Sequence, residues 1–459
     1  MLLFPALAIC FPQLTPAHAQ GTLSPIFTNG PTSNRINIVV ISEGYTSNQL
    51  GQFLVDATNA VNHLLSAQPY QEYRSFFNAF AISVASLNSG SDHPENGIYK
   101  DTYFNSTFNS YGYQSLLTIP PNNYETNYNM GQGRVDSLVT NLVPEFDLVI
   151  LLVNDIQKGS SALFQRKTLI SSLHFTWPDM IRHESGHAFA NLGDEYETSC
   201  PATPAEYPNV TAQTNRSLIK WRHWILESTP IPTPETQDFS LLVGLFQGAQ
   251  CQSSGWYRPK LDCRMRTESK PFCEVCSEQI VYSIYQHVRP IESFSPPVTN
   301  VSLTTTQAVL FSVTPLQPQT HSLSVQWFTN GIAVTGETNQ TYLLLPTLLT
   351  NGTNTIRAEV SDTTPIVRND PDGRLRDSVT WALDVNITEL RLLSPQRLPG
   401  GQFTFDIAGN APHGFIIQAS TNLAHWTSLS TNTLTNGMLH YTNAASSDSR
   451  RFYRTTSIP

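Results

Sequence analysis

The chain has 459 residues, with 26 lysines and arginines against 35 aspartates and glutamates, so its formal net charge is −9. This acidic balance excludes the basic surface that nucleic-acid binding requires, and no nucleic-acid partner is expected. Charged residues make up only 13% of the chain, which fits a secreted, polar and β-rich protein. The length predicts about three domains.

The N-terminus is a short apolar run that ends in Ala17-His18-Ala19. Such a run before a small-residue site is typical of a secretory signal peptide, so we predict a signal at residues 1–19 with cleavage after Ala19. The usual basic start is missing, which leaves a truncated or misassigned start open. No other stretch approaches the roughly 18 apolar residues of a membrane helix, so we expect a secreted or cell-surface protein without a membrane span.

Strands and helices alternate over the next part of the chain. Residues 35–42 predict a buried strand, residues 47–65 a helix and residues 79–86 a second strand. Residues 134–143 predict another helix. Residues 146–153 are nearly all apolar and predict a central strand that is buried on both faces.

Two further stretches bear on ligands. Residues 88–128 are polar and without periodicity, so they predict a ligand-facing loop region rather than core. Within them, Asp92 and His93 offer cation ligands, but a solvated turn is the preferred interpretation. Residues 168–173 predict an edge strand along which an extended peptide could pair.

A helix capped by Thr176 is predicted next, and it carries the main motif of the chain. His183 and His187 are four residues apart and therefore stand one turn above each other on one helix face. Two imidazoles in this arrangement can bind one Zn²⁺. Glu184 can then act as general base on a metal-bound water without ligating the metal.

The residues after this helix predict a third ligand. Asn191 and Gly193 both tolerate positive φ, so the helix can end here and the chain can turn back toward the metal. Asp194 then supplies a carboxylate, and a fourth position stays open for water. Glu195 is either the alternative third ligand or a residue that supports the ligands without contacting the metal. The competing interpretation is a surface helix with two histidines by chance.

The segment HESGHAFANLGDEYE, which begins at His183, resembles the active-site segment of the M64 peptidases, the IgA-peptidase-like igalysins of the metzincin clan. It departs from the general metzincin pattern HExxHxxGxxH at Ala190 and Gly193, but M64 members share its DEY ending. Asn191 stands where M64 members usually have glycine. The resemblance covers about residues 35–290 and implies an α+β, zincin-like catalytic domain with a mixed twisted sheet, an active-site helix and one catalytic Zn²⁺.

Metzincins also carry a methionine in a tight turn below the zinc. The resemblance makes Met265 the candidate for this Met-turn, where it would form a soft apolar floor and not a ligand. An ordinary core methionine is the alternative interpretation. Residues 276–288 predict a helix that closes the catalytic domain.

Five cysteines remain once Cys10 leaves with the signal. In an exported protein we expect them to form disulfides, with one thiol left over and the connectivity open. The alternatives are that Cys273 and Cys276 form a redox pair, or that they form half of a structural zinc site together with Cys251 and Cys263. The five are Cys200, Cys251, Cys263, Cys273 and Cys276.

We predict a catalytic domain at residues 20–292 and two small all-β domains after a linker. Residues 298–387 contain short alternating strands, Asn-Gly turns and Trp327, which predict an immunoglobulin-like sandwich with a buried tryptophan. Residues 388–459 resemble a small β module of secreted bacterial proteins. Neither domain shows a nucleophile-base pair, so we expect only contacts with a cell surface, a polysaccharide or the substrate.

The sequence thus predicts a secreted zinc-dependent endopeptidase that hydrolyses protein or peptide substrates. The specificity for immunoglobulin A belongs to particular family members and is not transferred. A non-catalytic adhesion protein on a zincin scaffold is one alternative, which the presence of Glu184 disfavours. A zinc amidase that acts on non-protein amides is another. The oxyanion-stabilising residue is open among Tyr257, Arg264, Arg266 and Tyr282.

Overall fold

The computed structural model describes residues 21–119, 129–163, 167–198, 203–304, 307–350, 352–386, 390–409, 414–434, 438–445, 447–448 and 450–458. The predicted signal peptide and Cys200 lie outside them. The chain divides into two compact units, of which the first contains the residues up to Val288 together with Pro318–Thr320 and Pro365–Asp370. The domain boundaries at residues 292 and 387 stay predictions. None of the helices in the described part combines the length and apolar character needed to cross a membrane.

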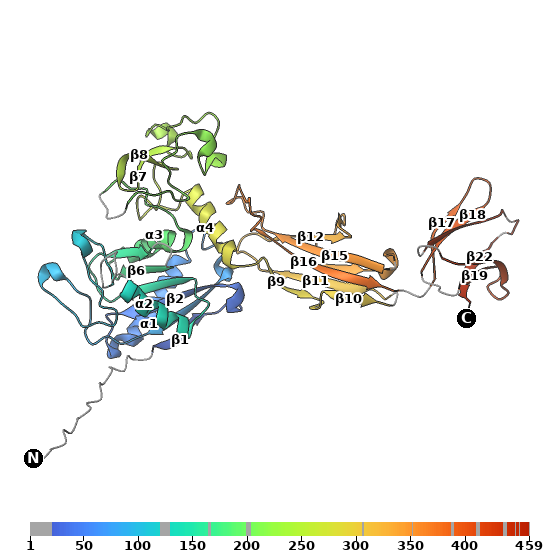
Figure 1. Cartoon of the computed structure of the whole chain (residues 1–459), viewed down its shortest axis with the longest axis horizontal. Coiled ribbons are helices and arrows are strands. Elements are labelled where there is room, and N and C mark those ends of the chain that lie inside the picture. Colours follow the sequence, from blue (N-terminus) through green and yellow to red (C-terminus); the bar gives the residue numbers. More distant parts are fainter. Residues whose placement is uncertain are drawn as a thin grey trace, which may run out of the picture. The chain divides into compact units, whose positions relative to one another are not determined.

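The first unit is built on a six-stranded mixed sheet with the strand order β1-β3-β2-β4-β6-β5. Three of its strands, β1, β2 and β6, are labelled in Figure 1. Its strands are β1 Thr22–Phe27, β2 Ile36–Glu43, β3 Phe77–Ser83, β4 Leu148–Val153, β5 Ser160–Leu163 and β6 Thr168–Ser172. The inner strands β3, β2, β4 and β6 run parallel, whereas β1 and β5 are antiparallel to their neighbours. The predicted mixed sheet is therefore confirmed.

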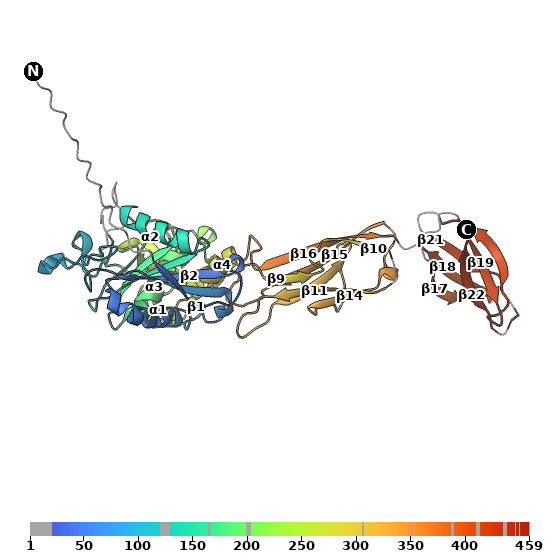
Figure 2. The same ribbon diagram turned by 90° about the horizontal axis from the view of Figure 1, so that it is seen from below.

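Helices cover both faces of this sheet, which explains why every residue of β2 and β4 is buried. Helix α1 (Leu50–Leu64) contacts β2 and β3, and helix α3 (Trp177–Ala190) contacts β4, β5 and β6. Helix α2 (Asn129–Leu142) lies on the opposite face (Figure 2). Its Val135 and Val139 belong to the same buried core cluster as Val39 and Leu151. Helix α4 (Glu274–His287), the predicted closing helix, packs against α3.

The prediction that residues 168–173 form the edge strand of the sheet is wrong. Strand β6 lies inside the sheet, and β5 forms the edge. Residues 160–162 are Ser-Ser-Ala, so no apolar alternation marks them, and they become a strand by pairing with β6. On its other side Ser160 bridges Leu116.

The stretch 88–119 is not the ligand-facing loop outside the core that its composition predicts, and residues 120–128 of the same prediction lie outside the described residues. Four of its apolar residues are buried in the core on the α2 face of the sheet, namely Phe104, Phe108, Leu117 and Ile119. The interpretation of Asp92 and His93 as a solvated turn is also wrong, because only 6% and 9% of these residues are exposed. The His93 ring stacks on Phe108, and its Nε2 lies 2.8 Å from Oδ2 of Asp155. The aromatic residues of this stretch are too widely spaced to show periodicity, so only the long-range packing reveals them as core.

Little regular structure connects α3 to α4. The described residues from 203 onward form a hairpin of β7 (Phe246–Ala249) and β8 (Gln252–Arg258), which is labelled in Figure 1. A tight turn at residues 263–267 follows, in which Arg266 N and Thr267 N donate to Cys263 O. This turn leads into α4.

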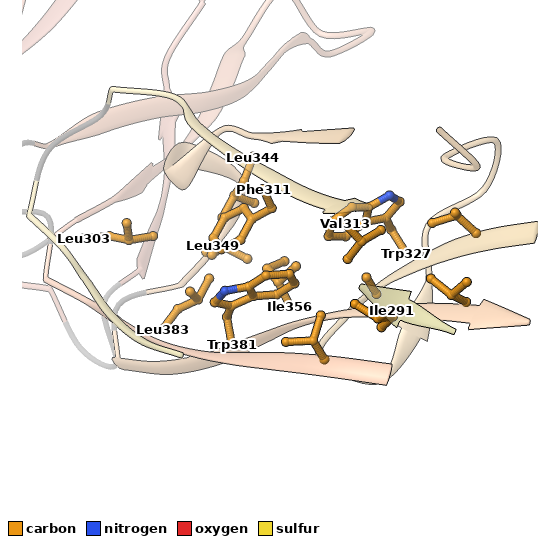
Figure 3. Close-up of a cluster of buried hydrophobic side chains, with 14 of the residues drawn as sticks. Ile291, Leu303, Phe311, Val313, Trp327, Leu344, Leu349, Ile356, Trp381 and Leu383 are labelled. Atoms are coloured by element: carbon orange, nitrogen blue, oxygen red, sulfur yellow. The ribbon is translucent and has the colours of Figure 1, made fainter. Parts of the chain in front are cut away.

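The described residues of the second unit form strands, turns and a short 3-10 helix at Pro346–Leu348, so the predicted all-β C-terminal part is confirmed. Two sheets, β10-β16-β15-β12-β13 and β14-β11-β9, enclose one core. Trp327 is fully buried, as predicted, and stacks on Trp381 at a ring distance of 5.9 Å (Figure 3). The predicted Asn330-Gly331 turn joins β12 to β13 with positive φ at both residues. These strands are β9 Ile291–Ser295, β10 Asn300–Leu303, β11 Val309–Pro315, β12 Ser324–Thr329, β13 Ile332–Ala333, β14 Thr341–Leu344, β15 Gly352–Ser361 and β16 Arg376–Val385.

The last described residues form two further three-stranded sheets, β17-β18-β21 and β20-β19-β22, around a separate small core. Phe405, Ile407, Phe415 and Ile417 are the buried residues of that core. The strands are β17 Arg391–Arg397, β18 Phe403–Ala408, β19 Phe415–Ser420, β20 Thr427–Asn432, β21 Met438–Asn443 and β22 Phe452–Ser457.

Candidate active site

Helix α3 presents both histidines of the motif, and all residues from His183 to Ala190 are buried. The helix ends at Asn191, which adopts the left-handed conformation (φ 52°, ψ 37°), and Leu192 N donates to Gly186 O at 2.9 Å. This is the Schellman ending that reverses the chain. Gly193, the other predicted turn residue, has no positive φ. It is needed for space, because a Cβ there would lie 2.7 Å from Val210.

The reversal brings Asp194 against the two imidazoles. His183 Nε2 and His187 Nε2 lie 3.2 Å apart, and Asp194 Oδ1 lies 3.2 and 3.0 Å from them. These three atoms form a nearly regular triangle. The structure therefore brings together the three residues that the sequence predicts as metal ligands.

The tautomers of the histidines follow from their outer nitrogens. His183 Nδ1 lies 3.0 Å from Arg264 O, and His187 Nδ1 lies 2.6 Å from Leu192 O. A carbonyl oxygen only accepts hydrogen bonds, so both Nδ1 atoms carry the proton of the neutral ring. Each Nε2 then turns a lone pair toward the other and toward a carboxylate oxygen, which is the arrangement that a cation stabilises.

The electrostatics of the triangle agree with this view. Burial alone would lower the pKa of His183, but its hydrogen bond to Asp194 and the charges of Glu184 and Asp194 raise that pKa to about 9. Burial alone would raise the pKa of Asp194, yet the two histidines hold it below its usual range. Positive charge at the centre of the triangle is therefore favoured, and the three residues fit a cation.

Glu184 lies beside this triangle and is not one of the three residues whose ligand atoms could share a metal ion. Its carboxylate accepts a hydrogen bond from Ser160 Oγ on β5 at 2.8 Å. Burial raises the pKa of Glu184 above its usual value of 4.5. The sequence analysis missed Ser160, because nothing in a Ser-Ser-Ala segment marks one hydroxyl as the partner of a glutamate 24 positions away.

Met265 is fully buried directly beneath the motif. A Cβ added to Gly186, between the two histidines, would lie 2.7 Å from Met265 Sδ. The main chain of the same turn holds the site in place, since Arg264 O accepts from His183 and Met265 O accepts from Glu195 N at 2.8 Å. This position suits the predicted floor of the site.

Glu195 faces away from the triangle. Its Oε1 accepts a hydrogen bond from Asn209 Nδ2 at 2.8 Å and lies 3.3 Å from Cys276 Sγ. Asp194 is therefore the acid beside the histidines, and the alternative placement of Glu195 as their third partner is not what the structure shows.

Tyr196 is a further neighbour that the sequence analysis did not single out. Its ring stacks on His183 at a centroid distance of 6.3 Å. Burial, the charges of Asp194 and Glu184, and a hydrogen bond to Asp194 raise the pKa of Tyr196. The phenol therefore keeps its proton throughout the neutral pH range and can donate it in a hydrogen bond.

The arginines named as oxyanion donors form hydrogen bonds with groups outside the triangle. Arg264 Nη1 lies 3.0 Å from Asp179 Oδ1, and Arg266 Nη1 donates to Leu261 O at 3.0 Å. Tyr257 belongs to β8 and Tyr282 to α4. Tyr196, by contrast, stacks on His183 of the triangle.

Three cysteines depart from the disulfide prediction. Cys263, Cys273 and Cys276 are free and buried, and they form a group with Glu195. Cys251 is disulfide-bonded and is not a member of this group.

The fold and the triangle define a candidate mononuclear metal centre with a buried glutamate beside it, which is the layout of a metal-dependent hydrolase. A sequence model described as IgA Peptidase M64 matches residues 25–241 and 235–284. These segments cover more than half of the chain and include the triangle, Glu184, Ser160 and Met265. The protein therefore belongs to the M64 peptidase family, and the resemblance stated from the motif is confirmed.

No curated protein matches the chain. Among solved structures, fibronectin(III)-like modules of Clostridium thermocellum CbhA share 9% identity over 36% of this chain and 90% of theirs, with a TM-score of 0.16. Titin domains A168–A170 share 9% identity over 36% of this chain and 56% of theirs, with a TM-score of 0.15. The amphioxus IgVJ-C2 molecule shares 12% identity over 34% of this chain and 98% of its own, with a TM-score of 0.13. Scores this low support no conclusion about fold or function.

Proposed function

We propose that this protein is a secreted, zinc-dependent endopeptidase in which His183, His187 and Asp194 hold one zinc ion and Glu184 is the general base. The observation that carries the proposal is the triangle of two Nε2 atoms and one carboxylate oxygen with sides of 3.0 to 3.2 Å. Membership of a peptidase family supports it.

The donor set and its spacing fit zinc. Tetrahedral zinc with bonds of about 2.0–2.1 Å to nitrogen and oxygen places its ligand atoms about 3.3 Å apart. The observed triangle is within a few tenths of an ångström of that value. Both histidines also donate their outer N–H to main-chain carbonyls, as zinc-binding histidines do.

Zinc bound at this triangle would supply a Lewis acid that polarises the scissile carbonyl and makes water nucleophilic near neutral pH. Glu184 takes the proton from the attacking water and delivers it to the leaving amine. Its raised pKa brings the protonated form, which the second step requires, closer to the working pH. Ser160 fixes the orientation of the carboxylate.

We assign the stabilisation of the oxyanion to Tyr196. Its phenol stays protonated, stacks on His183 and hydrogen-bonds to Asp194, so this hydrogen bond would pass from Asp194 to a negatively charged oxygen that forms beside the triangle. This assignment replaces the open choice between the tyrosines and arginines named above.

The decisive experiment compares the wild type with Glu184→Gln on casein and on a broad peptide library, together with the zinc content of both. We expect Glu184→Gln to retain zinc and to lose about 10²–10⁴ in kcat/KM, the typical contribution of general acid–base catalysis. Glu145→Gln, an exposed glutamate of the same unit, is the matched control and should be fully active.

The alternatives predict different outcomes. If zinc-loaded wild type cleaves no peptide, the endopeptidase proposal is wrong and the adhesion protein is favoured. If it cleaves only amides that are not peptides, a zinc amidase is favoured. N-terminal sequencing of the exported protein tests cleavage after Ala19. Contact of the C-terminal β modules with a polysaccharide has no support among the described residues and stays a prediction.

A further inference from the structure

A second group of buried ligand-type side chains lies next to the triangle but takes no part in the proposed catalysis. It consists of Cys263, Cys273, Cys276 and Glu195, and one ligand atom of each lies within 4.8 Å of all the others. The four residues are between 0% and 7% exposed. Buried thiols need no such partner, but a buried carboxylate among them needs a group of opposite charge or hydrogen-bond donors.

The spacing of Cys263 and Cys276 excludes a disulfide between these two residues and fits a metal. The sulfurs of Cys263 and Cys276 lie 3.7 Å apart, whereas a disulfide bond is about 2.0 Å long. Tetrahedral zinc with zinc–sulfur bonds of about 2.3 Å places two sulfurs about 3.8 Å apart. The 3.3 Å between Cys276 Sγ and Glu195 Oε1 is close to the roughly 3.5 Å expected for one sulfur and one oxygen ligand.

Burial raises the pKa of Cys263 and of Cys276, but the main chain around the thiols opposes this effect and favours thiolates. Cys273 N donates to Cys263 Sγ at 3.2 Å, and such N–H···S bonds are typical of the surroundings of metal-bound thiolates. Cys273 is the N-cap residue of α4, so Cys276 lies in its first turn. The positive end of the helix dipole stabilises thiolates at both positions.

Glu195 provides an independent observation. It is fully buried, and its Oε2 has no hydrogen-bond partner among the described residues. Its other oxygen is held by Asn209 Nδ2, so the carboxylate is fixed in place. A buried carboxylate whose second oxygen has no partner is costly, and a cation bound to the carboxylate offsets that cost.

We propose that Cys263, Cys273, Cys276 and Glu195 bind a second, structural zinc ion, distinct from the catalytic one. Thiolate-rich sets of four protein ligands select zinc and leave no open position for water. Because Glu195 follows Asp194 directly, this ion ties the acid of the triangle to the Met265 turn and to the start of α4. The proposal does not depend on peptidase activity.

Zinc content per chain tests the proposal on the full-length protein purified without reductant. We expect about two zinc ions in the wild type and about one in His183→Ala/His187→Ala, which loses only the catalytic ion. Cys273→Ser/Cys276→Ser should also hold about one, while Ser277→Ala, a change in the same helical turn, should keep both. A wild type that holds only the zinc ion bound by the cysteines would contradict the proposed function but not this second site.

Because the cysteine variant can fail to fold, a measurement on the wild type accompanies it. Cobalt-substituted wild type should show the near-ultraviolet sulfur-to-cobalt charge-transfer absorption, and His183→Ala/His187→Ala should retain it. A cobalt-loaded wild type without this absorption overturns the proposal. So does a disulfide between any two of the three cysteines, detected by mass spectrometry of the unreduced protein.

Discussion

The hydroxyl of Ser160 lies 2.8 Å from Oε1 of Glu184 and donates a hydrogen bond to it. The two residues come from the edge strand β5 and from helix α3, so the position of the general base depends on how the helix packs on the sheet edge. The hydrogen bond favours the ionised carboxylate and opposes burial, which raises the pKa of Glu184.

Ser160→Ala should therefore move the pH profile of kcat/KM. Without the hydrogen bond the pKa of Glu184 rises further, and the base is active only when deprotonated, so activity is lost at a higher pH as the solution is acidified. We expect the acid limb to shift upward by about one pH unit. Ser161→Ala is the control, since Ser161 Oγ bonds to Leu117 O instead. An acid limb that is the same in Ser160→Ala and the wild type rules out this role.

Removal of the metal or of its carboxylate ligand should abolish activity. Dialysis against a chelator is expected to inactivate the protein, and added zinc should restore it. Asp194→Asn removes the charged corner of the triangle and should weaken catalytic zinc binding by at least about tenfold, measured by competition with a zinc indicator. Glu197→Gln, at an exposed residue of the same loop, should bind zinc normally. Equal zinc affinity in Asp194→Asn and wild type would argue against the ligand assignment.

Tyr196→Phe should lower kcat and leave KM and zinc content nearly unchanged, because the hydroxyl acts on charge that develops only in the transition state. Loss of one oxyanion donor typically costs about 10²–10³ in kcat. Tyr257→Phe and Tyr282→Phe are the comparison variants. The assignment fails if either of these has the larger effect on kcat.

Gly186 and Met265 should show coupled effects on stability. Met265→Ala opens a cavity beneath the motif and should cost about 2–5 kcal/mol. Gly186→Ala forces its Cβ to within 2.7 Å of Met265 Sδ and should cost about 1–3 kcal/mol. In the double variant the new methyl group occupies part of the cavity. The loss of stability in the double variant should therefore be smaller than the sum of the two single-variant losses by about 0.5–3 kcal/mol. Chemical denaturation of the four proteins measures this cycle, and strict additivity would mean that the two side chains are not in contact.

Asp147 should make the first unit sensitive to acid. Oδ1 of Asp147 lies 2.9 Å from His287 Nδ1, and Oδ2 accepts from Asn37 N at 3.0 Å. Burial alone would raise the pKa of Asp147, but these partners and Lys167 hold it below 3.8. The unfolded chain therefore binds this proton more readily, so the stabilisation is complete above pH 3.8 and is lost as the pH falls from there through the lower folded-state pKa.

Asp147→Asn should accordingly be less stable than wild type at neutral pH, and the difference should shrink below about pH 4. Urea titrations between pH 7 and pH 3 measure it. The difference should not shrink for Asp136→Asn, a change on helix α2 at a residue whose described partner is Gln132. A constant difference for Asp147→Asn would exclude the proposed linkage.

Local pattern predicted the parts of the site that lie on one helix. His183 and His187 share a helix face because of their spacing, and Asn191 ends that helix because it tolerates the left-handed conformation. The buried strands β2 and β4 were recognised from their apolar runs. Strand β5, however, has no pattern of its own and owes its conformation to β6.

The amino-acid sequence by itself determined the family, the two histidines, the glutamate between them and the acid that follows the turn, because those features lie within a few residues and depend on helix geometry. Only the tertiary structure decided that Asp194 and not Glu195 meets the histidines, that Ser160 holds Glu184, and that three cysteines gather around Glu195. These contacts join residues up to 81 positions apart, and their existence depends on how the sheet edge, the Met265 turn and α4 pack together.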